Sequence, residues 1–87
     1  MTETHEVRLK RLTMRSMRRG IKEMDVILMR FTALRLATMT PADLDAYEAL
    51  LDENDQDIYQ WVSGQKLPPA PLAAMVATVR ETLPDLG

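Results

Sequence analysis

The sequence predicts an all-α protein, a compact five-helix bundle that forms a single small domain over residues 1–87. Apolar residues recur at helical spacing along the chain, and no stretch shows the alternation of a half-buried β-strand. Glycines and prolines fall between the periodic segments and divide them into five short helices with short connections. A length of 87 residues suits one core, and no linker-like tract separates two parts.

The first two helices are predicted over Thr4–Arg18 and Ile21–Leu36, with a break near Arg19-Gly20. Glycine costs about 1 kcal/mol inside a helix, so Gly20 is a natural place for the chain to turn. Apolar residues nevertheless keep a 3-4-3-4 spacing through this point, so one long helix is the alternative. The apolar residues with this spacing are Met14, Met17, Ile21, Met24 and Leu28.

The third and fourth helices are marked by their caps. Thr40 and Pro41 suit the N-cap and the first position of the third helix. Asp55 is predicted as the N-cap of a fourth helix over residues 56–62. Gly64 suits the left-handed position that follows its end.

A fifth helix is predicted to open at Pro71 and to stop at Pro84. Trp61 of the fourth helix is interpreted as a core anchor. The residues expected on the buried sides of the last three helices are Leu44, Tyr47, Leu51, Ile58, Trp61, Val62, Leu72, Met75, Val76, Val79 and Leu83.

Charge is divided unevenly along the chain. Residues 1–39 hold nine Lys or Arg against four Asp or Glu, a net charge of +5, whereas residues 40–87 hold two against nine, a net charge of −7. A basic half is typical of proteins that bind nucleic acid, an anionic ligand or an acidic protein face. The acidic half would repel a polyanion, and its residues 52–57 are interpreted as a solvated loop.

Few residues offer catalytic or metal-binding chemistry. Cysteine is absent, which excludes disulfides, thiolate chemistry and Cys-ligated zinc. His5 lies near the N-terminus, where we expect it to be solvated and without a role. On a helix the side chains of Glu23 and Asp25 diverge by roughly 200°, which makes a poor acid–base pair, and carboxylates at this spacing form no calcium loop. We therefore expect no catalytic residue and no metal site.

The segment Arg18-Arg19-Gly20-x-x-Glu23-x-Asp25 concentrates charge around a glycine. One interpretation is a pair of solvated helix ends, in which arginines and Glu23 act as caps. The other is a recognition patch, because glycine lets another backbone come close and arginine offers a planar fork to carboxylate or phosphate. Four methionines lie in or near the segment: Met14, Met17, Met24 and Met29. Methionine packs in a core or on a contact surface, and we favour core positions for these four by about 2:1.

Two stretches resemble the SdhE family, the small FAD assembly factors that promote flavinylation of succinate dehydrogenase. RRGIKEMDVILMRF, at residues 18–31, is similar to the family's Arg-Gly-x-x-Glu signature. LLDENDQDIYQWVSGQKLP, at residues 50–68, resembles its segment of two leucines, an acidic turn, an aromatic residue, a tryptophan and a closing glycine. Bacterial relatives often have Pro-Phe-Phe where this chain has Arg30-Phe31-Thr32.

The resemblance implies a five-helix fold and a non-enzymatic role. Family members bind the flavoprotein subunit of succinate dehydrogenase, in some bacteria that of fumarate reductase, and promote attachment of FAD to a histidine of that subunit. The chain would then need no cofactor of its own. The partner-binding residues implied are Arg18, Arg19, Gly20, Glu23 and Asp25.

The resemblance and the composition together predict a bacterial cytoplasmic protein that is a monomer when free. No apolar run approaches the roughly 20 residues of a membrane span, so no membrane insertion is expected. The N-terminus has acidic residues and no apolar segment, unlike a secretory signal, and a mitochondrial transit peptide would be poor in acid.

Two other functions fit part of the sequence. A small nucleic-acid-binding module would use the basic half and bind with steep salt dependence, although no aromatic residues are interleaved with its cations. A generic helical adaptor would use the charged segment only to cap helices.

Overall fold

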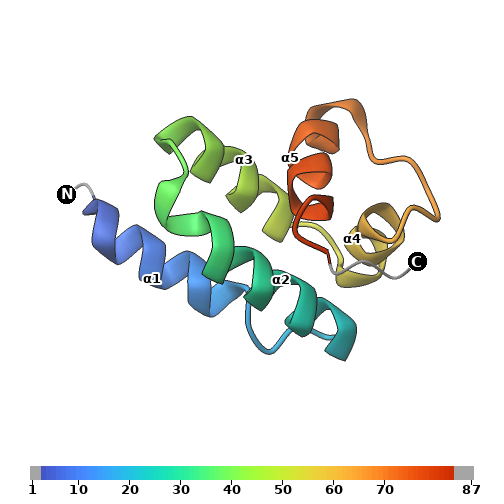
Figure 1. Cartoon of the computed structure of the whole chain (residues 1–87), viewed down its shortest axis with the longest axis horizontal. Coiled ribbons are helices and arrows are strands. Elements are labelled where there is room, and N and C mark those ends of the chain that lie inside the picture. The colour runs from blue at the N-terminus through green and yellow to red at the C-terminus, as the bar shows by residue number, and fades with distance from the viewer. Residues whose placement is uncertain (1–2, 84–87) are drawn as a thin grey trace.

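The computed structural model describes residues 3–83, and its regular structure is entirely helical over that range (Figure 1). The helices are α1 (His5–Arg15), α2 (Lys22–Arg35), η1 (Leu36–Thr38), a short 3₁₀ helix, then α3 (Pro41–Leu51), α4 (Asp55–Val62) and α5 (Ala70–Arg80). The predicted all-α fold with five helices in one small domain is confirmed. Pro84, the predicted stop of the last helix, lies outside the described residues.

The predicted break between the first two helices is confirmed, but its geometry differs from the expectation. α1 ends at Arg15 rather than Arg18, and residues 16–21 connect it to α2. The residue in the left-handed region is Arg18, with φ of 54°, and not Gly20. The single long helix is therefore wrong, because a left-handed residue ends an α-helix.

The caps of α3 and α4 confirm most of the predicted boundaries. Thr40 Oγ1 accepts from the Asp43 N–H at 3.1 Å, and the Asp43 carboxylate accepts in return from the Thr40 N–H at 3.2 Å, which forms a capping box. Gly64 follows α4 with φ of 84°, as predicted. The predicted N-cap of α4 is wrong, because Asn54 occupies that position and its side chain accepts from the Gln56 N–H at 2.8 Å.

The apolar core lies mainly between α2, α3, α4 and α5. The rings of Phe31 and Tyr47 pack at its centre, 5.0 Å apart and tilted by 41°. Trp61 is buried, as predicted, whereas Leu72 and Leu83 are only partly buried. Buried residues that the periodicity did not single out are Leu36, Met39 and Leu50.

The methionines divide between core and surface. Met24 is fully buried, but Met14 is 73% exposed, and Met17 and Met29 are also exposed. The core interpretation is right for Met24 alone. Met14 lies near the end of α1, Met17 in the connection after it and Met29 on the exposed side of α2. Because the chain turns between α1 and α2, their regular spacing does not place them on one face of a single helix.

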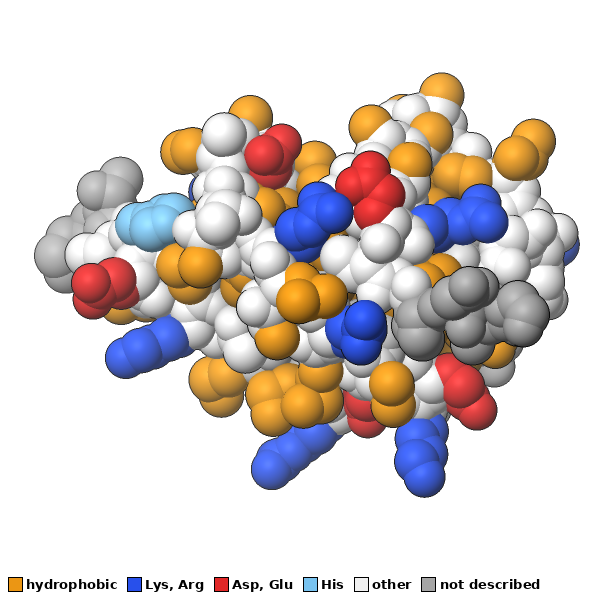
Figure 2. Space-filling model, in the orientation of Figure 1, with side chains coloured by type: hydrophobic (Ala, Val, Ile, Leu, Met, Phe, Trp, Pro, Cys, Tyr) orange, Lys and Arg blue, Asp and Glu red, His pale blue; other side chains and the backbone are white. Residues whose placement is uncertain are grey.

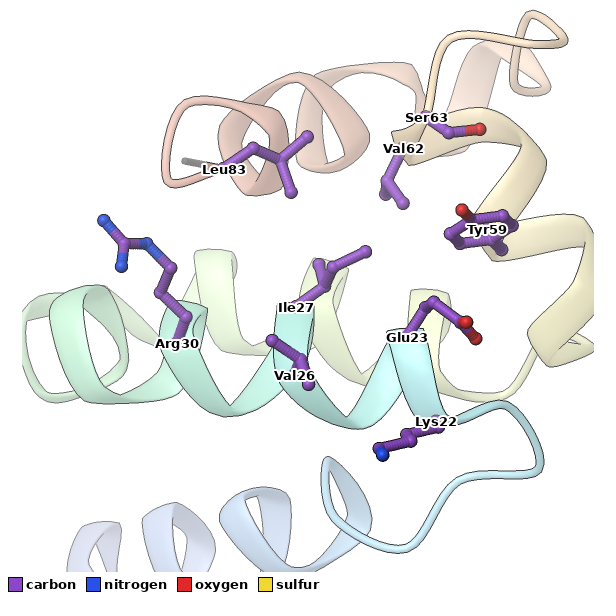
Figure 3. Close-up of a pocket in the computed structure, with 9 residues that line it drawn as sticks. All are labelled: Lys22, Glu23, Val26, Ile27, Arg30, Tyr59, Val62, Ser63 and Leu83. Atoms are coloured by element: carbon purple, nitrogen blue, oxygen red, sulfur yellow. The ribbon is translucent and has the colours of Figure 1, made fainter. Parts of the chain in front are cut away.

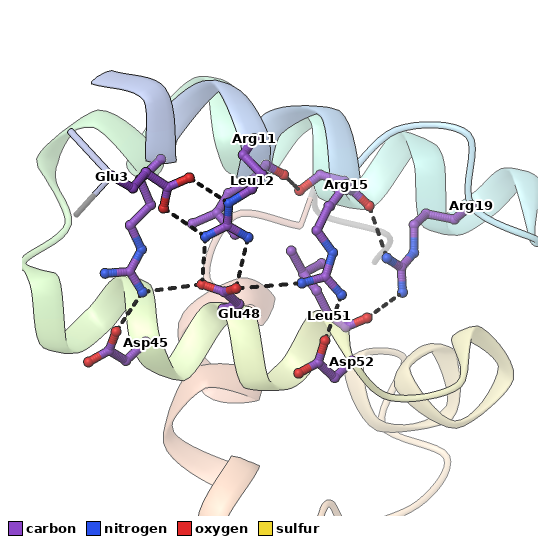
Figure 4. A network of polar contacts seen from close by, with 11 residues as sticks. Glu3, Arg11, Leu12, Arg15, Arg19, Asp45, Glu48, Leu51 and Asp52 are labelled. Carbon is purple, nitrogen blue, oxygen red and sulfur yellow. Dashed lines mark hydrogen bonds and ion pairs between the residues drawn. The ribbon is translucent and has the colours of Figure 1, made fainter. Parts of the chain in front are cut away.

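Four ion pairs, here called the ion-pair ladder, join α1 and the connection after it to α3, to the residue that follows α3 and to α4. Figure 4 shows the pairs of Arg11 with Glu48 and of Arg15 with Asp52. The partners are separated by 36 or 37 residues in every pair, so α1 and α3 run in the same direction. The pairs are Arg8–Asp45, Arg11–Glu48, Arg15–Asp52 and Arg19–Asp55, with closest distances of 2.5, 2.8, 2.7 and 2.6 Å.

The ion-pair ladder accounts for part of the uneven charge along the sequence. Four cations of the basic half are paired with carboxylates of the acidic half inside the same molecule. Residues 52–57 are consequently more than a solvated loop, because Asp52 and Asp55 both bind arginines. The space-filling view shows basic, acidic and apolar side chains interleaved on the face it presents, rather than one basic field (Figure 2). This arrangement argues against the nucleic-acid module.

Candidate partner-binding site at the Arg-Gly loop

Residues 16–21, here called the Arg-Gly loop, leave α1 and enter α2. Ser16 starts the loop from inside the core, where its buried hydroxyl lies 2.6 Å from the Tyr47 hydroxyl and donates to the Leu12 carbonyl at 2.8 Å. Ile21 ends the loop as the N-cap of α2, with extended backbone. The two ends are therefore anchored, and the segment between them is exposed except at Arg19.

Arg19 points into the protein and not toward a partner. Its guanidinium donates to the Asp55 carboxylate at 2.6 Å. It also donates to the Arg15 carbonyl at 2.9 Å and to the Leu51 carbonyl at 3.0 Å (Figure 4). Only 12% of its side chain is exposed. Arg19 lies outside α2, which begins at Lys22, so it cannot form an i,i+4 helical pair with Glu23.

Two carboxylates hold the backbone of the loop. Asp55 Oδ2 accepts from the Gly20 N–H at 2.7 Å while its Oδ1 binds Arg19. Asp25, in the first turn of α2, accepts from the Arg19 N–H. We call the bonds of Asp55 to Arg19 and Gly20 the Asp55 clamp. Asp55 could not be picked out from the signature, but one signal was present: acidic residues at 45, 48 and 52 repeat the spacing of arginines at 8, 11 and 15, and the next acidic residue and arginine, at 55 and 19, depart from it by one position.

The five predicted site residues therefore divide into two sets. Arg18, Gly20 and Glu23 are exposed, whereas Arg19 and Asp25 bind within the protein. The outer set presents a cation, a bare backbone and a carboxylate close together on one loop and the helix turn after it. The role of the five residues in binding a partner stays a prediction.

A groove of about 560 Å³ adjoins Glu23, between α2 and α4 (Figure 3). Val26 and Ile27 of α2 face Tyr59 and Val62 of α4 across it. The remaining lining residues are Lys22, Glu23, Arg30, Ser63 and Leu83. The groove therefore has apolar walls and charged groups on its α2 side, and Glu23 belongs to both the groove and the charged segment.

Within residues 3–83 no three or more His, Asp or Glu side chains gather where they could hold a metal ion. His5 is exposed at the first position of α1. None of the helices in the described range is long and apolar enough to span a membrane. The chemistry available at the loop is recognition by charge, hydrogen bonding and close backbone contact.

A family described as "Flavinator of succinate dehydrogenase" matches residues 10–83 of this chain. The chain belongs to this family. The family prediction is thereby confirmed. The residues of the predicted signature lie inside the matched range.

Yeast relatives named "Succinate dehydrogenase assembly factor 2, mitochondrial" match the same region. The relative from Scheffersomyces stipitis is 48% identical over 61 residues, which cover 70% of this chain and 41% of the relative. The relative from Yarrowia lipolytica is 38% identical over 86 residues, which cover 98% of this chain and 59% of the relative. The chain thus spans roughly two to three fifths of the length of these proteins. Their name describes assembly, a non-catalytic role, as predicted.

The predicted bacterial cytoplasmic location is wrong, because these relatives are mitochondrial proteins of yeasts. The absence of cysteine fits any reducing compartment, so the composition does not distinguish one such compartment from another.

Proposed function

We propose that this chain binds the flavoprotein subunit of succinate dehydrogenase, or the related subunit of fumarate reductase, and promotes covalent attachment of FAD to it. We call that subunit the client. The observation that carries the proposal is the Arg-Gly loop, which is anchored from within and exposes a glycine between charged groups in a chain of the flavinator family.

Each of the three exposed signature residues, Arg18, Gly20 and Glu23, has a distinct role in this proposal. Gly20 has no side chain and lets a client backbone approach closely. Arg18 offers its guanidinium to a client carboxylate or to a flavin phosphate. Glu23 accepts hydrogen bonds at the edge of the groove, and the groove takes apolar client side chains.

The chain needs no catalytic group to accelerate the attachment. A factor that binds one client conformation more tightly than the others raises the population of that conformation. If the flavin and the acceptor histidine are aligned in it, near-attack geometry alone is worth several kcal/mol. FAD is then the cofactor of the client, and this chain acts as a monomer with no cofactor of its own.

The test is to produce the client with and without this chain in cells that lack their own assembly factor. Covalent flavin is recorded as fluorescence of the client band after denaturing electrophoresis. We expect a several-fold increase when this chain is present. Equal fluorescence in the two preparations would refute the proposal.

Gly20→Arg should abolish the increase while leaving helical circular dichroism close to wild type. Gly20 is exposed and lies outside the left-handed region, so its backbone conformation does not require glycine. A Cβ at this position would lie 3.3 Å from Asp55 Oδ2, which is tight but not a clash. Ala73→Arg is the matched control, since Ala73 is an exposed residue of α5. Full activity of Gly20→Arg would remove the loop from the proposed contact.

A further inference from the structure

The guanidinium of Arg19 is engaged within the protein, and only 12% of the side chain is exposed. Its Nε, Nη1 and Nη2 atoms each donate to a group of the same chain, and these groups belong to different elements. Arg15 ends α1, Leu51 ends α3 and Asp55 begins α4. The arginine of the signature therefore joins three helices at the point where the exposed loop leaves them.

We infer that Asp55 is a positioning residue, which acts through the Asp55 clamp to hold the Arg-Gly loop in its client-binding conformation, and that Arg19 does not contact the client. The inference rests on the proposed function and goes further. It assigns Arg19 to the support of the Arg-Gly loop and not to the surface that contacts the client. The client would touch Arg18, Gly20 and Glu23.

The geometry of the carboxylate supports this role. Its two oxygens bind two consecutive residues, the Arg19 side chain through Oδ1 and the Gly20 N–H through Oδ2. One rigid group at the start of α4 thus fixes both a side chain and a peptide plane of the loop. The carboxylate is only 19% exposed, so water competes weakly for its part-buried bond to Arg19.

The backbone next to the clamp requires such support. Arg18 has φ of 54°, a conformation that residues other than glycine adopt only where the surroundings impose it. The restraints come immediately after it, from the bonds of Asp25 and Asp55 to residues 19 and 20. Without Asp55 we expect residues 18–20 to sample several conformations, most of which misplace Arg18 relative to Glu23.

The ion-pair ladder provides a matched control for removing this carboxylate. Asp52 also pairs with an arginine, Arg15, at 2.7 Å, but it has no bond to the loop. Asp55→Ala and Asp52→Ala therefore each remove one aspartate–arginine pair, and only the first releases Gly20. We expect Asp55→Ala to weaken binding to the FAD-free client at least tenfold and Asp52→Ala to change it less than twofold. Equal effects of the two substitutions would overturn the inference.

The Gly20 amide proton gives a readout that a general loss of stability would not move. A bond to a carboxylate shifts this proton downfield in a nuclear magnetic resonance spectrum, and Asp55→Ala should return it toward the value of an exposed amide. Asp52→Ala should leave it in place. A weakened client affinity with an unmoved Gly20 amide would show that Asp55 acts by another route and would also overturn the inference.

A double-mutant cycle tests whether Arg19 touches the client. Arg19→Ala and Asp55→Ala break the same clamp, so the double variant should bind the client about as well as Asp55→Ala alone. Glu23→Ala, which removes a contact residue, should lower the affinity further in the same background. Arg19→Ala also releases the Arg15 and Leu51 carbonyls, so the melting temperature of each variant is measured alongside. A further large loss of affinity on adding Arg19→Ala, with the melting temperature unchanged, would mean that Arg19 itself contacts the client, contrary to the inference.

Folding failure and failure of the proposed function are both recognisable. Each measurement is made well below the melting temperature of the variant, and Asp55→Asn, which keeps the shape and one acceptor oxygen, replaces Asp55→Ala if that variant does not fold. If the wild-type chain neither binds the client nor raises its covalent flavin, the proposed function fails. If the wild type does both and neither Asp55 variant differs from its Asp52 counterpart, only the positioning role fails.

Discussion

α1 and α5 are both eleven residues long, yet they are attached to the protein by different forces. α5 buries Met75, Val76 and Val79 in the core, whereas Leu12 is the one buried residue of α1. α1 is held instead by the ion-pair ladder along α3 and, just beyond its end, by the Ser16–Tyr47 hydrogen bond. The Arg-Gly loop follows directly from this polar attachment, so salt and pH should affect the loop side of the molecule before they affect the core.

The largest loss of stability should come from a substitution in α5, which is held by apolar contacts. Met75→Ala removes a buried side chain of α5 and should lower the free energy of unfolding by about 3 kcal/mol. Chemical denaturation followed by circular dichroism measures the change. Because the cavity lies in the shared core, we expect hydrogen-exchange protection to fall in α2, α3 and α5 together. A change below about 1 kcal/mol would show that α5 is not anchored by its apolar residues.

Leu12→Ala tests the one apolar anchor of α1 and should have a smaller and more local effect. We expect a loss of about 2 kcal/mol, near the low end for a buried leucine, because α1 can detach and relieve the cavity. Hydrogen exchange of α1 amides should accelerate far more than that of α5 amides. Uniform acceleration throughout the protein would mean that the two attachments are not separable.

Tyr47→Phe should cost about 1 kcal/mol, because it removes a buried hydrogen bond but leaves Ser16 bonded to the Leu12 carbonyl. It should also change the alkaline limit of stability. Burial raises the pKa of Tyr47 from 10.0 to about 12. The unfolded chain therefore releases this proton at a lower pH than the folded one, and wild-type stability should fall as pH rises from 10 to 12. The Phe variant should lack this part of the fall in a denaturation series.

The ion-pair ladder should show the smallest effect, visible mainly in α1. Hydrogen bonding to Arg11 holds the pKa of Glu48 below its ordinary value of 4.5. The stability that this carboxylate contributes is fully present above pH 4.5 and is lost as pH falls through the lowered pKa. Exposed pairs are each worth only roughly 0.2–1 kcal/mol, so exchange of α1 amides should rise a few-fold in acid or at about 1 M salt.

Glu48→Gln is the control for that titration. It should raise α1 exchange at neutral pH and remove most of the acid dependence, since Glu48 binds Arg8 and Arg11 together. Exchange in α5 should stay unchanged in the variant. An acid response in α5 as large as that in α1 would contradict the division between the two attachments.

Local chemistry made much of the fold predictable. The break before α2, the capping box at Thr40 and the left-handed Gly64 all follow from the preferences of single residues or near neighbours. The family signature was recognisable for the same reason, because it lies in one continuous stretch. The error at the start of α4 has a tertiary cause: Asp55 and Asn54 are both good N-cap residues, but the Asp55 carboxylate binds Arg19 and Gly20, and Asn54 caps the helix.

The sequence by itself determined five helices, their main caps and the exposed glycine between charged residues. Tertiary structure alone decided which of those charges face outward. A pair such as Arg19 and Asp55 is separated by 36 residues, and whether its members meet depends on how α1 and α3 lie relative to each other. The number of residues between two side chains does not show whether they meet, because helices of the same composition can pack in several directions.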